Sequence, residues 1–303
     1  MKSLQADFFK VMKEGAIQYA APLPFLDLVC VGTATQTEVE EQVDLMYSLI
    51  HQQVDAIVLV PIDSKALVQP VVEAVRKGVP VINIDIRLDT QLLEQAGVEV
   101  AFVGPDNFAA AYEVGKLLDK KLRNEDKVAI IEGLTAADNA QQRKRGFIKA
   151  IEEKGLRLVA SEPADWETEK AAEVFQAMWM RYPDLKAVYC SNDAMALGVL
   201  QQMQEKNCYL PVVGFDNDAV MKEFLSTGKL VATADIFSSQ MAVRGIEFAL
   251  DVLEGKIENR GVHSTALENS LQIEHMVNDE FDEEYCAEDY DGYYDIDDFQ
   301  IKF

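Results

Sequence analysis

Apolar and polar residues alternate along this chain in blocks that predict strands separated by amphipathic helices. The β-branched apolar runs expected to form the first strands are residues 26–31, 56–60, 79–84 and 98–103. Residues 8–20, 38–52 and 65–77 carry apolar side chains at helical spacing. Gly78 ends the last of these helices, and Pro80 opens the next strand. Strands and helices in this alternation are typical of a parallel sheet.

A second series of elements with a similar size follows the first. Its expected strands are residues 128–131, 158–160, 187–190 and 212–215. Its expected helices are residues 141–154, 167–181, 194–205 and 220–227, with a further helix at 240–253. Two successive α/β series predict two similar domains with a cleft between them. We expect the boundary near residues 104–107.

Two polar clusters follow strands of the second series. Residues 187–190 lead into Ser191-Asn192-Asp193 and then into an apolar helix, and residues 212–215 lead into Asp216-Asn217. Asn and Asp cap helices because their side-chain oxygens accept the amides of the first turn. Polar side chains at the carboxyl ends of parallel strands also face the ligand crevice of an open α/β sheet. The clusters therefore predict a binding site for a small polar ligand.

Taken together, these segments resemble the type I periplasmic binding proteins, in the ribose-binding branch. The resemblance covers residues 3–277 and implies two Rossmann-like, three-layer α/β lobes with parallel sheets. It also implies a three-segment hinge, with crossings near residues 104–107, 234–238 and 261–264, and closure around a ligand. The implied parts are an N-terminal lobe of residues 1–104 and 236–263, a C-terminal lobe of residues 105–235 and 264–277, and a tail of residues 278–303.

The resemblance implies aromatic contacts to the ligand. Phe8 and Phe9 match an aromatic pair that encloses a sugar ring, whose C–H faces are apolar. Trp166 stands where the opposite lobe often carries an aromatic residue. The alternative for the two phenylalanines is packing in the core at the start of the first helix. The alternative for Trp166 is to cover a helix end.

The polar ligand contacts implied by the resemblance are Asp85, Arg143, Asn192, Asp216 and Asp235. Carboxylates accept strong hydrogen bonds from hydroxyls, and the planar guanidinium of an arginine binds two oxygens at once. The alternative at the arginine position is Arg145, which we expect on a solvated helix face. The family often has Arg directly after the aspartate, whereas this chain has Asp85-Ile86-Arg87, so Arg87 is displaced by one position.

Two polar positions of the family are lost in this chain. Ala6 replaces an Asn before the aromatic pair, and Ile236 replaces a Gln at the second crossing. Neither side chain can bond a hydroxyl. The ligand is therefore expected to be less hydroxylated on that side than ribose, or to be held differently. A deoxy sugar, a polyol or a furanosyl derivative would be consistent with the loss of these two polar positions.

Charge and hydropathy exclude several partners. The formal net charge is −24, from 28 basic and 52 acidic residues, which argues against nucleic acid because phosphates need clustered Lys and Arg. No apolar run approaches the roughly 18 residues of a spanning helix. The resemblance to the periplasmic binding proteins implies a location in the periplasm or cell envelope, and we expect a monomer.

Neither cysteines nor histidines form a pattern that indicates a metal, a cofactor or catalysis. The four cysteines are scattered without metal-like spacing, and Cys30 and Cys190 lie in apolar runs as small hydrophobic residues. The three histidines, His51, His263 and His275, are also scattered. We therefore expect no metal, no cofactor and no enzyme activity.

Both ends depart from the family. A hydrophobic strand precedes residues 3–9 in its members, but here only Met1-Lys2 do, so we expect the signal and most of the opening strand to be absent. Residues 279–303 hold eleven acids and one base, with many aromatics, and suggest a solvated or partner-binding tail. Alternatives are a partial calcium loop at residues 287–298, or a strand at 298–303 that fills the gap in the first sheet.

Three classes of function compete. The first is a solute-binding protein that captures a sugar or polyol and presents it to the permease of an ABC importer. The second is the ligand-sensing module of a receptor, or of a lactose-repressor-type regulator without its DNA-binding domain. The third is an enzyme, for which Asp and Arg side chains in a cleft could serve as acid and base, but the resemblance favours binding.

Overall fold

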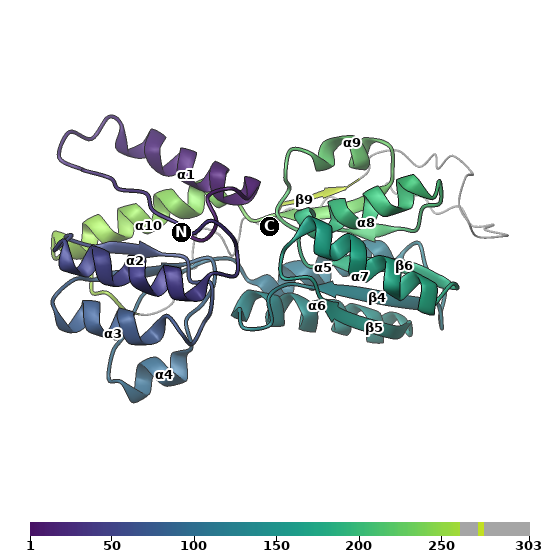
Figure 1. The fold of residues 1–303 in the computed structure, drawn as a ribbon, viewed down its shortest axis with the longest axis horizontal. Coiled ribbons are helices and arrows are strands. Elements are labelled where there is room, and N and C mark those ends of the chain that lie inside the picture. The colour runs from purple at the N-terminus through teal and green to yellow at the C-terminus, as the bar shows by residue number, and fades with distance from the viewer. Residues whose placement is uncertain (261–271, 276–303) are drawn as a thin grey trace. The chain divides into compact units, whose positions relative to one another are not determined.

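A computed structural model describes residues 1–260 and 272–275, and this part of the chain divides into two compact α/β units (Figure 1). The first unit comprises Met1–Asp106, Leu134–Gln142 and residues 237–260. The second comprises Asn107–Gly133, Arg143–Ile236 and the strand Gln272–His275. Each unit is built on a sheet of parallel strands, which confirms the predicted fold class.

The first unit has a parallel sheet in the order β1-β2-β3. Its strands are β1 (Ile57–Leu59), β2 (Val81–Ile84) and β3 (Phe102–Val103). Its helices are α1 (Asp7–Ala20), α2 (Val39–His51), α3 (Val68–Arg76), α4 (Thr90–Gln95) and α10 (Ser238–Leu253). In register, Val58 lies opposite Ile82, and Ile84 lies opposite Val103.

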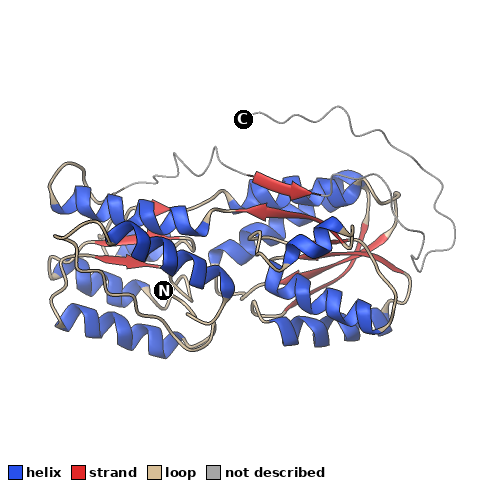
Figure 2. Ribbon diagram, turned by 90° about the horizontal axis from the view of Figure 1, so that it is seen from above, coloured by secondary structure: helices blue, strands red, loops and turns tan. Residues whose placement is uncertain are grey.

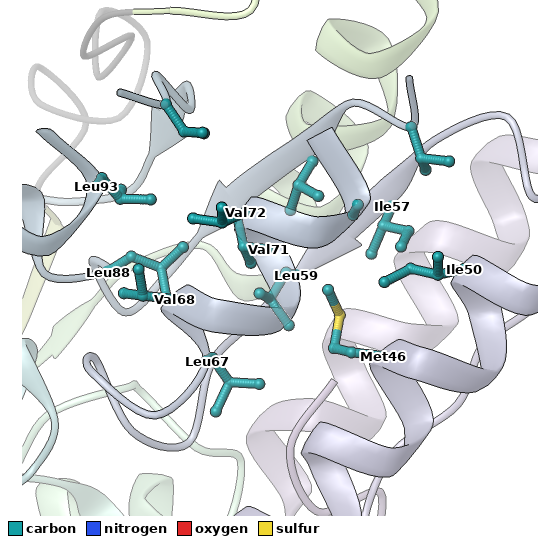
Figure 3. Packing of buried hydrophobic residues seen from close by; sticks show 14 residues of the cluster. Met46, Ile50, Ile57, Leu59, Leu67, Val68, Val71, Val72, Leu88 and Leu93 are labelled. Carbon is teal, nitrogen blue, oxygen red and sulfur yellow. The ribbon is translucent and has the colours of Figure 1, made fainter. Parts of the chain in front are cut away.

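Successive side chains of β1 point to opposite faces of the sheet, so the core of this unit has a part on each face. On one face, strand residues meet α2 and α3 in a cluster that includes Met46, Ile50, Ile57, Leu59, Val71 and Val72 (Figure 3). Val58 points to the other face, which α10 covers, and a Cβ on Gly245 would lie 2.8 Å from its methyl carbon. Helix α1 packs against α10 on that side.

The prediction of a strand at residues 26–31 is wrong. Among the described residues, no strand pairs with this segment, and the sheet of the first unit begins at β1. The N-terminal ammonium of Met1 donates to the Val31 carbonyl at 2.8 Å, and the side chain of Val29 is 59% exposed. A β-branched run becomes a strand only where a neighbouring strand supplies hydrogen bonds, so tertiary context overrides the local pattern here.

The second unit has a larger sheet, and its strands are red in Figure 2. The strand order is β5-β4-β6-β7-β8-β9. Its strands are β4 (Lys127–Glu132), β5 (Arg157–Pro163), β6 (Leu185–Cys190), β7 (Val212–Val213), β8 (Leu230–Asp235) and β9 (Gln272–His275). Its helices are α5 (Asn107–Asp119), α6 (Asp138–Lys154), α7 (Thr168–Arg181), α8 (Asp193–Glu205) and α9 (Met221–Ser226). All neighbours are parallel except β9, which runs antiparallel to β8. The start of α6 belongs to the segment Leu134–Gln142 of the first unit.

Small residues let the helices of the second unit approach closely. A Cβ on Gly115 of α5 would lie 2.9 Å from the methyl of Ala150 on α6. A Cβ on Gly198 of α8 would lie 2.0 Å from the carbonyl oxygen of Thr168, at the start of α7. The contact between α7 and α8 therefore requires glycine at position 198.

Several predictions fall on residues outside the described part of the chain. These are the third crossing at residues 261–264 and the acidic segment from residue 278, with its calcium-loop and strand hypotheses. The predicted lobe boundaries stay predictions.

We expect Gly198→Ala to destabilise the second unit. The new methyl would collide with a backbone oxygen that cannot rotate away, and overpacking of this kind costs about 1–3 kcal/mol. Helix propensity alone would favour Ala by about 1 kcal/mol, so the two effects oppose each other. Urea unfolding decides between them, with Gln201→Ala on the exposed side of α8 as the control. A midpoint unchanged or raised by Gly198→Ala would contradict the packing.

A pH-dependent term in stability is expected from Asp119, which is 6% exposed and accepts a hydrogen bond from the buried Tyr189 hydroxyl. Burial raises the pKa of Asp119 to about 6 from its ordinary 3.8, although the Tyr189 bond opposes this. The folded state thus binds the proton more tightly than the unfolded state. The contribution of Asp119 to the free energy of unfolding is therefore fully present below about pH 4 and is lost as pH rises through about 6.

Asp119→Asn keeps an acceptor for Tyr189 but removes this titration. The free energy of unfolding of the variant, relative to wild type, should rise between pH 4 and 7 by about 2–3 kcal/mol at most. Chemical denaturation at several pH values measures it. A difference that stays constant with pH would show that Asp119 does not titrate in this range.

Candidate functional site

Phe8 and Phe9 lie in the first turn of α1 and are buried, at 9% and 3% exposure. Their rings meet edge to face, with centroids 5.0 Å apart. The ammonium of Lys2, itself 2% exposed, lies 5.7 Å from the centre of the Phe9 ring. This buried cation was not among the predicted site residues. Ala6 occupies the N-cap position of α1 and makes no side-chain capping bond.

Asp85 directly follows β2 and is 2% exposed. It adopts a left-handed backbone conformation, with φ of 65°, and its amide donates to the Val103 carbonyl at 3.1 Å. The buried amide of Asn83 closes the turn, because its nitrogen donates to the Ile86 carbonyl at 2.8 Å and its oxygen accepts from the Leu88 amide at 2.9 Å. Asn83 thus fixes the backbone on which Asp85 is carried.

The displaced arginine, Arg87, packs on an aromatic ring of the same unit. Its guanidinium carbon lies 4.6 Å from the centre of the Phe102 ring. This distance is within the range of a cation–π contact. The one-residue shift in sequence therefore gives the guanidinium a partner on β3.

Arg143 is the most constrained of the predicted site residues. Its side chain projects from α6 and is 2% exposed. The Nε atom donates to Oδ1 of Asn107 at 2.8 Å, and Nη1 donates to the Ser191 carbonyl at 2.8 Å and to Asp216 at 3.2 Å. The guanidinium also lies over the ring of Phe215, 3.7 Å from its centre. Arg145, in contrast, is exposed, as expected of a solvated helix face.

Trp166 lies close to the same guanidinium, 5.6 Å from its carbon atom, and is 4% exposed. It has a φ of 70°, and Asp165 before it also has a positive φ of 53°. The indole packs against Gly133, the residue after β4, where a Cβ would lie 2.1 Å from a ring carbon. The loop is therefore shaped to bring this side chain to the carboxyl end of the sheet.

Asn192 caps α8, because its Oδ1 accepts the Met195 amide at 3.0 Å. The side chain is 7% exposed, and its amide nitrogen has no hydrogen-bond partner within the described residues. That nitrogen is thus available to donate to a ligand. The predicted cap is confirmed, while contact with a ligand stays a prediction.

Asp216 and Asp235 are linked through a neighbour. Asp216 accepts the bond from Arg143, and its own amide donates to the Ala234 carbonyl at 2.7 Å. The next residue, Asn217, donates from its side chain to Asp235 at 3.1 Å. Within the second unit, the structure thus brings Arg143, Trp166 and Asp216 into one cluster. Asp235 is connected to this cluster through Asn217, the residue that follows Asp216.

The prediction missed two members of this cluster, Asn107 and Phe215. Asn107 is 2% exposed at the start of α5, and Phe215 is fully buried. Phe215 stands in the Gly-Phe-Asp segment, where it could have been noticed as an aromatic beside a predicted ligand aspartate. Asn107 closes the predicted crossing at residues 104–107, but its sequence context gives no indication that it binds an arginine.

Within residues 1–260 and 272–275, no group of three or more His, Cys, Asp and Glu side chains could hold a metal ion. No helix in this part of the chain is long and apolar enough to cross a membrane.

A known protein-family model matches most of this chain. The model of the periplasmic binding protein domain matches residues 1–257. The chain therefore belongs to the periplasmic binding protein family, which confirms the resemblance predicted from the motifs.

Two relatives span nearly the same length as this chain. The D-ribose/D-allose-binding protein of Pseudomonas aeruginosa is 40% identical over 274 residues, which cover 88% of this chain and 86% of that protein. The D-allose-binding periplasmic protein of Escherichia coli is 31% identical over 256 residues, covering 83% and 82%. Both relatives are binding proteins.

Solved structures give the same fold. An ABC transporter solute-binding protein from Burkholderia multivorans, whose unknown ligand is represented as alpha-D-erythrofuranose, is 39% identical with a TM-score of 0.86, covering 90% of this chain and 96% of that one. A periplasmic solute-binding protein of an ABC transporter from Actinobacillus succinogenes, with bound D-allose, is 30% identical with a TM-score of 0.83, covering 90% and 95%.

Proposed function

We propose that this chain is a solute-binding protein that captures a sugar or related polyol and presents it to the permease of a membrane ABC importer. The buried cluster around Arg143 carries the proposal. It combines a planar cation, a carboxylate and two aromatic rings, 3.7 and 5.6 Å from the guanidinium carbon. Sugars present hydroxyls around their edge and apolar C–H groups on their faces, so they require this combination.

Each unit, taken by itself, carries some of the proposed ligand contacts. Phe8, Phe9 and Asp85 belong to the first unit, and the second unit contributes the larger polar set, namely Arg143, Trp166, Asn192, Asp216 and Asp235. Aromatic rings would cover the ring faces of the sugar, and the charged groups and the amide would bond its hydroxyls. Binding by these groups needs no cofactor and changes no covalent bond.

The names of these relatives support a monosaccharide as the ligand. The names of two relatives specify D-ribose and D-allose, and one similar structure contains D-allose. We propose a pentose or hexose of this kind as the ligand. The family supports action in the periplasm or cell envelope. We further propose that the chain is a monomer and that it meets a permease there.

A melting-shift screen over pentoses, hexoses and polyols tests the proposal directly. A ligand that binds only the folded state stabilises it by about 2.7 kcal/mol at a hundredfold excess over its Kd. We expect D-ribose or D-allose to raise the melting temperature clearly. A complete screen without a shift above noise would remove sugar binding as the function.

Arg143→Ala should weaken sugar binding much more than Arg145→Ala. Loss of a charged hydrogen-bond partner from a buried site costs about 1.5–3 kcal/mol, or roughly tenfold to a hundredfold in affinity. Calorimetry of both variants with the best sugar of the screen measures this. Arg145 is exposed on the same helix and is the matched control.

Because Asp216 would be left buried without its cation, thermal unfolding must show that Arg143→Ala is folded. Arg143→Lys serves as a second variant, since it keeps the charge but loses the planar pair of donors. Equal affinities for the Arg143 and Arg145 variants would place Arg143 outside the site.

A further inference from the structure

A fully buried carboxylate joins three segments of the second unit next to the proposed site. Asp193, the first residue of α8, has 0% exposure. Its Oδ1 accepts the Phe215 amide at 2.9 Å, and its Oδ2 accepts the Asp218 amide at 2.9 Å. The hydroxyl of Thr233 on β8 lies 2.9 and 3.0 Å from the two oxygens. One side chain thus connects the segments that follow β6 and β7 with strand β8.

Thr233 continues the connection to the segment that follows β7. Its hydroxyl has one proton, which it shares between the Asp193 oxygens, while its oxygen accepts the Asn217 amide at 3.2 Å. Thr233 is fully buried. Asp193 and Thr233 together therefore hold the backbone amides of residues 215, 217 and 218.

The backbone held in this way is strained. Asp216 has a φ of 114° and Asn217 a φ of 57°, which side-chain-bearing residues rarely adopt. Such conformations persist only where the surroundings impose them. Gly214 leaves room for the carboxylate, because a Cβ there would lie 1.9 Å from Oδ1 of Asp193. Burial raises the pKa of Asp193, and the backbone and hydroxyl bonds oppose that shift.

We infer that Asp193 and Thr233 are positioning residues for ligand binding. They impose the strained turn at residues 215–218, which aims the Asp216 carboxylate at Arg143 and keeps the Phe215 ring under its guanidinium. Neither residue is itself proposed to touch the sugar. The inference rests on the proposed function for its effect on affinity, but the effect on the Arg143 side chain holds without any ligand.

Thr233→Val tests the pair with little change in shape. It removes the hydroxyl from both Asp193 and the Asn217 amide, and we expect the affinity for the best sugar, measured by calorimetry, to fall about tenfold. Thr233→Ser restores the hydroxyl and should return the affinity to within about twofold of wild type. Thr227→Val, at the end of α9, removes a hydroxyl that bonds the Glu223 carbonyl at 3.0 Å and should leave affinity unchanged.

A double-mutant cycle separates positioning from general destabilisation. If Thr233 acts through Asp216, Thr233→Val should weaken binding by less than about twofold once Asp216→Asn is present. If the two losses instead multiply, or if Thr233→Val has no effect on binding, the inference is overturned. If Thr233→Val does not fold, Asp193→Asn is the second variant. It keeps the shape of the side chain but replaces one accepting oxygen by an amide nitrogen, which faces the donors that Asp193 now binds.

The Nε–H resonance of Arg143 provides a readout without sugar. In a ¹H–¹⁵N spectrum, Thr233→Val should shift this signal, while the Arg145 signal stays in place. In a protein that already carries Asp216→Asn, the addition of Thr233→Val should cause no further shift of the Arg143 signal. If no sugar binds the wild-type protein but the Arg143 signal responds as described, the proposed function fails and the positioning role stands. An unchanged Arg143 signal in Thr233→Val contradicts the positioning role, whatever the affinity.

Discussion

The buried guanidinium of Arg143 is the constraint on which the second unit's site depends. A charge at 2% exposure is tolerated only where hydrogen bonds and an opposite charge replace water. Here the replacements come from the start of α5, the end of β6 and the segment after β7. Removing one partner of a buried ion pair costs about 3–5 kcal/mol, so these segments are bound to α6 in one arrangement.

The two units organise their polar residues by different physical means. In the first unit, a neutral amide, Asn83, satisfies the turn that carries Asp85, and the nearby arginine packs on a ring. In the second unit, the carboxyl group of Asp193 accepts backbone amides, and Arg143 pairs with Asp216. Neutral hydrogen bonds are weaker than charge-assisted ones, so the bond between Arg143 and Asp216 is stronger than the bonds of Asn83.

Much of the fold follows from local rules, and the exceptions have identifiable causes. Asn192 was found because a capping side chain after an apolar run is a local signal. The strand expected at residues 26–31 was wrong because pairing depends on a neighbour that the pattern does not contain. No helix was predicted over Asn107–Asp119, where the structure has α5. The contact of its first residue, Asn107, with Arg143 could not be predicted, because the bond joins residues far apart in sequence. Positive φ at Asp85 and Asp216 is likewise imposed by tertiary contacts.

The position of Trp166 beside the guanidinium of Arg143 has a practical consequence for spectroscopy. The chain has two tryptophans, and this one is 4% exposed with a guanidinium 5.6 Å from its ring. Indole emission depends on the local electric field and on access of water. Any event that moves the cation, or replaces its carboxylate neighbour by another group, therefore changes the colour and yield of the emission. The fold thus contains an intrinsic optical reporter of the electrostatic state of its own charged cluster.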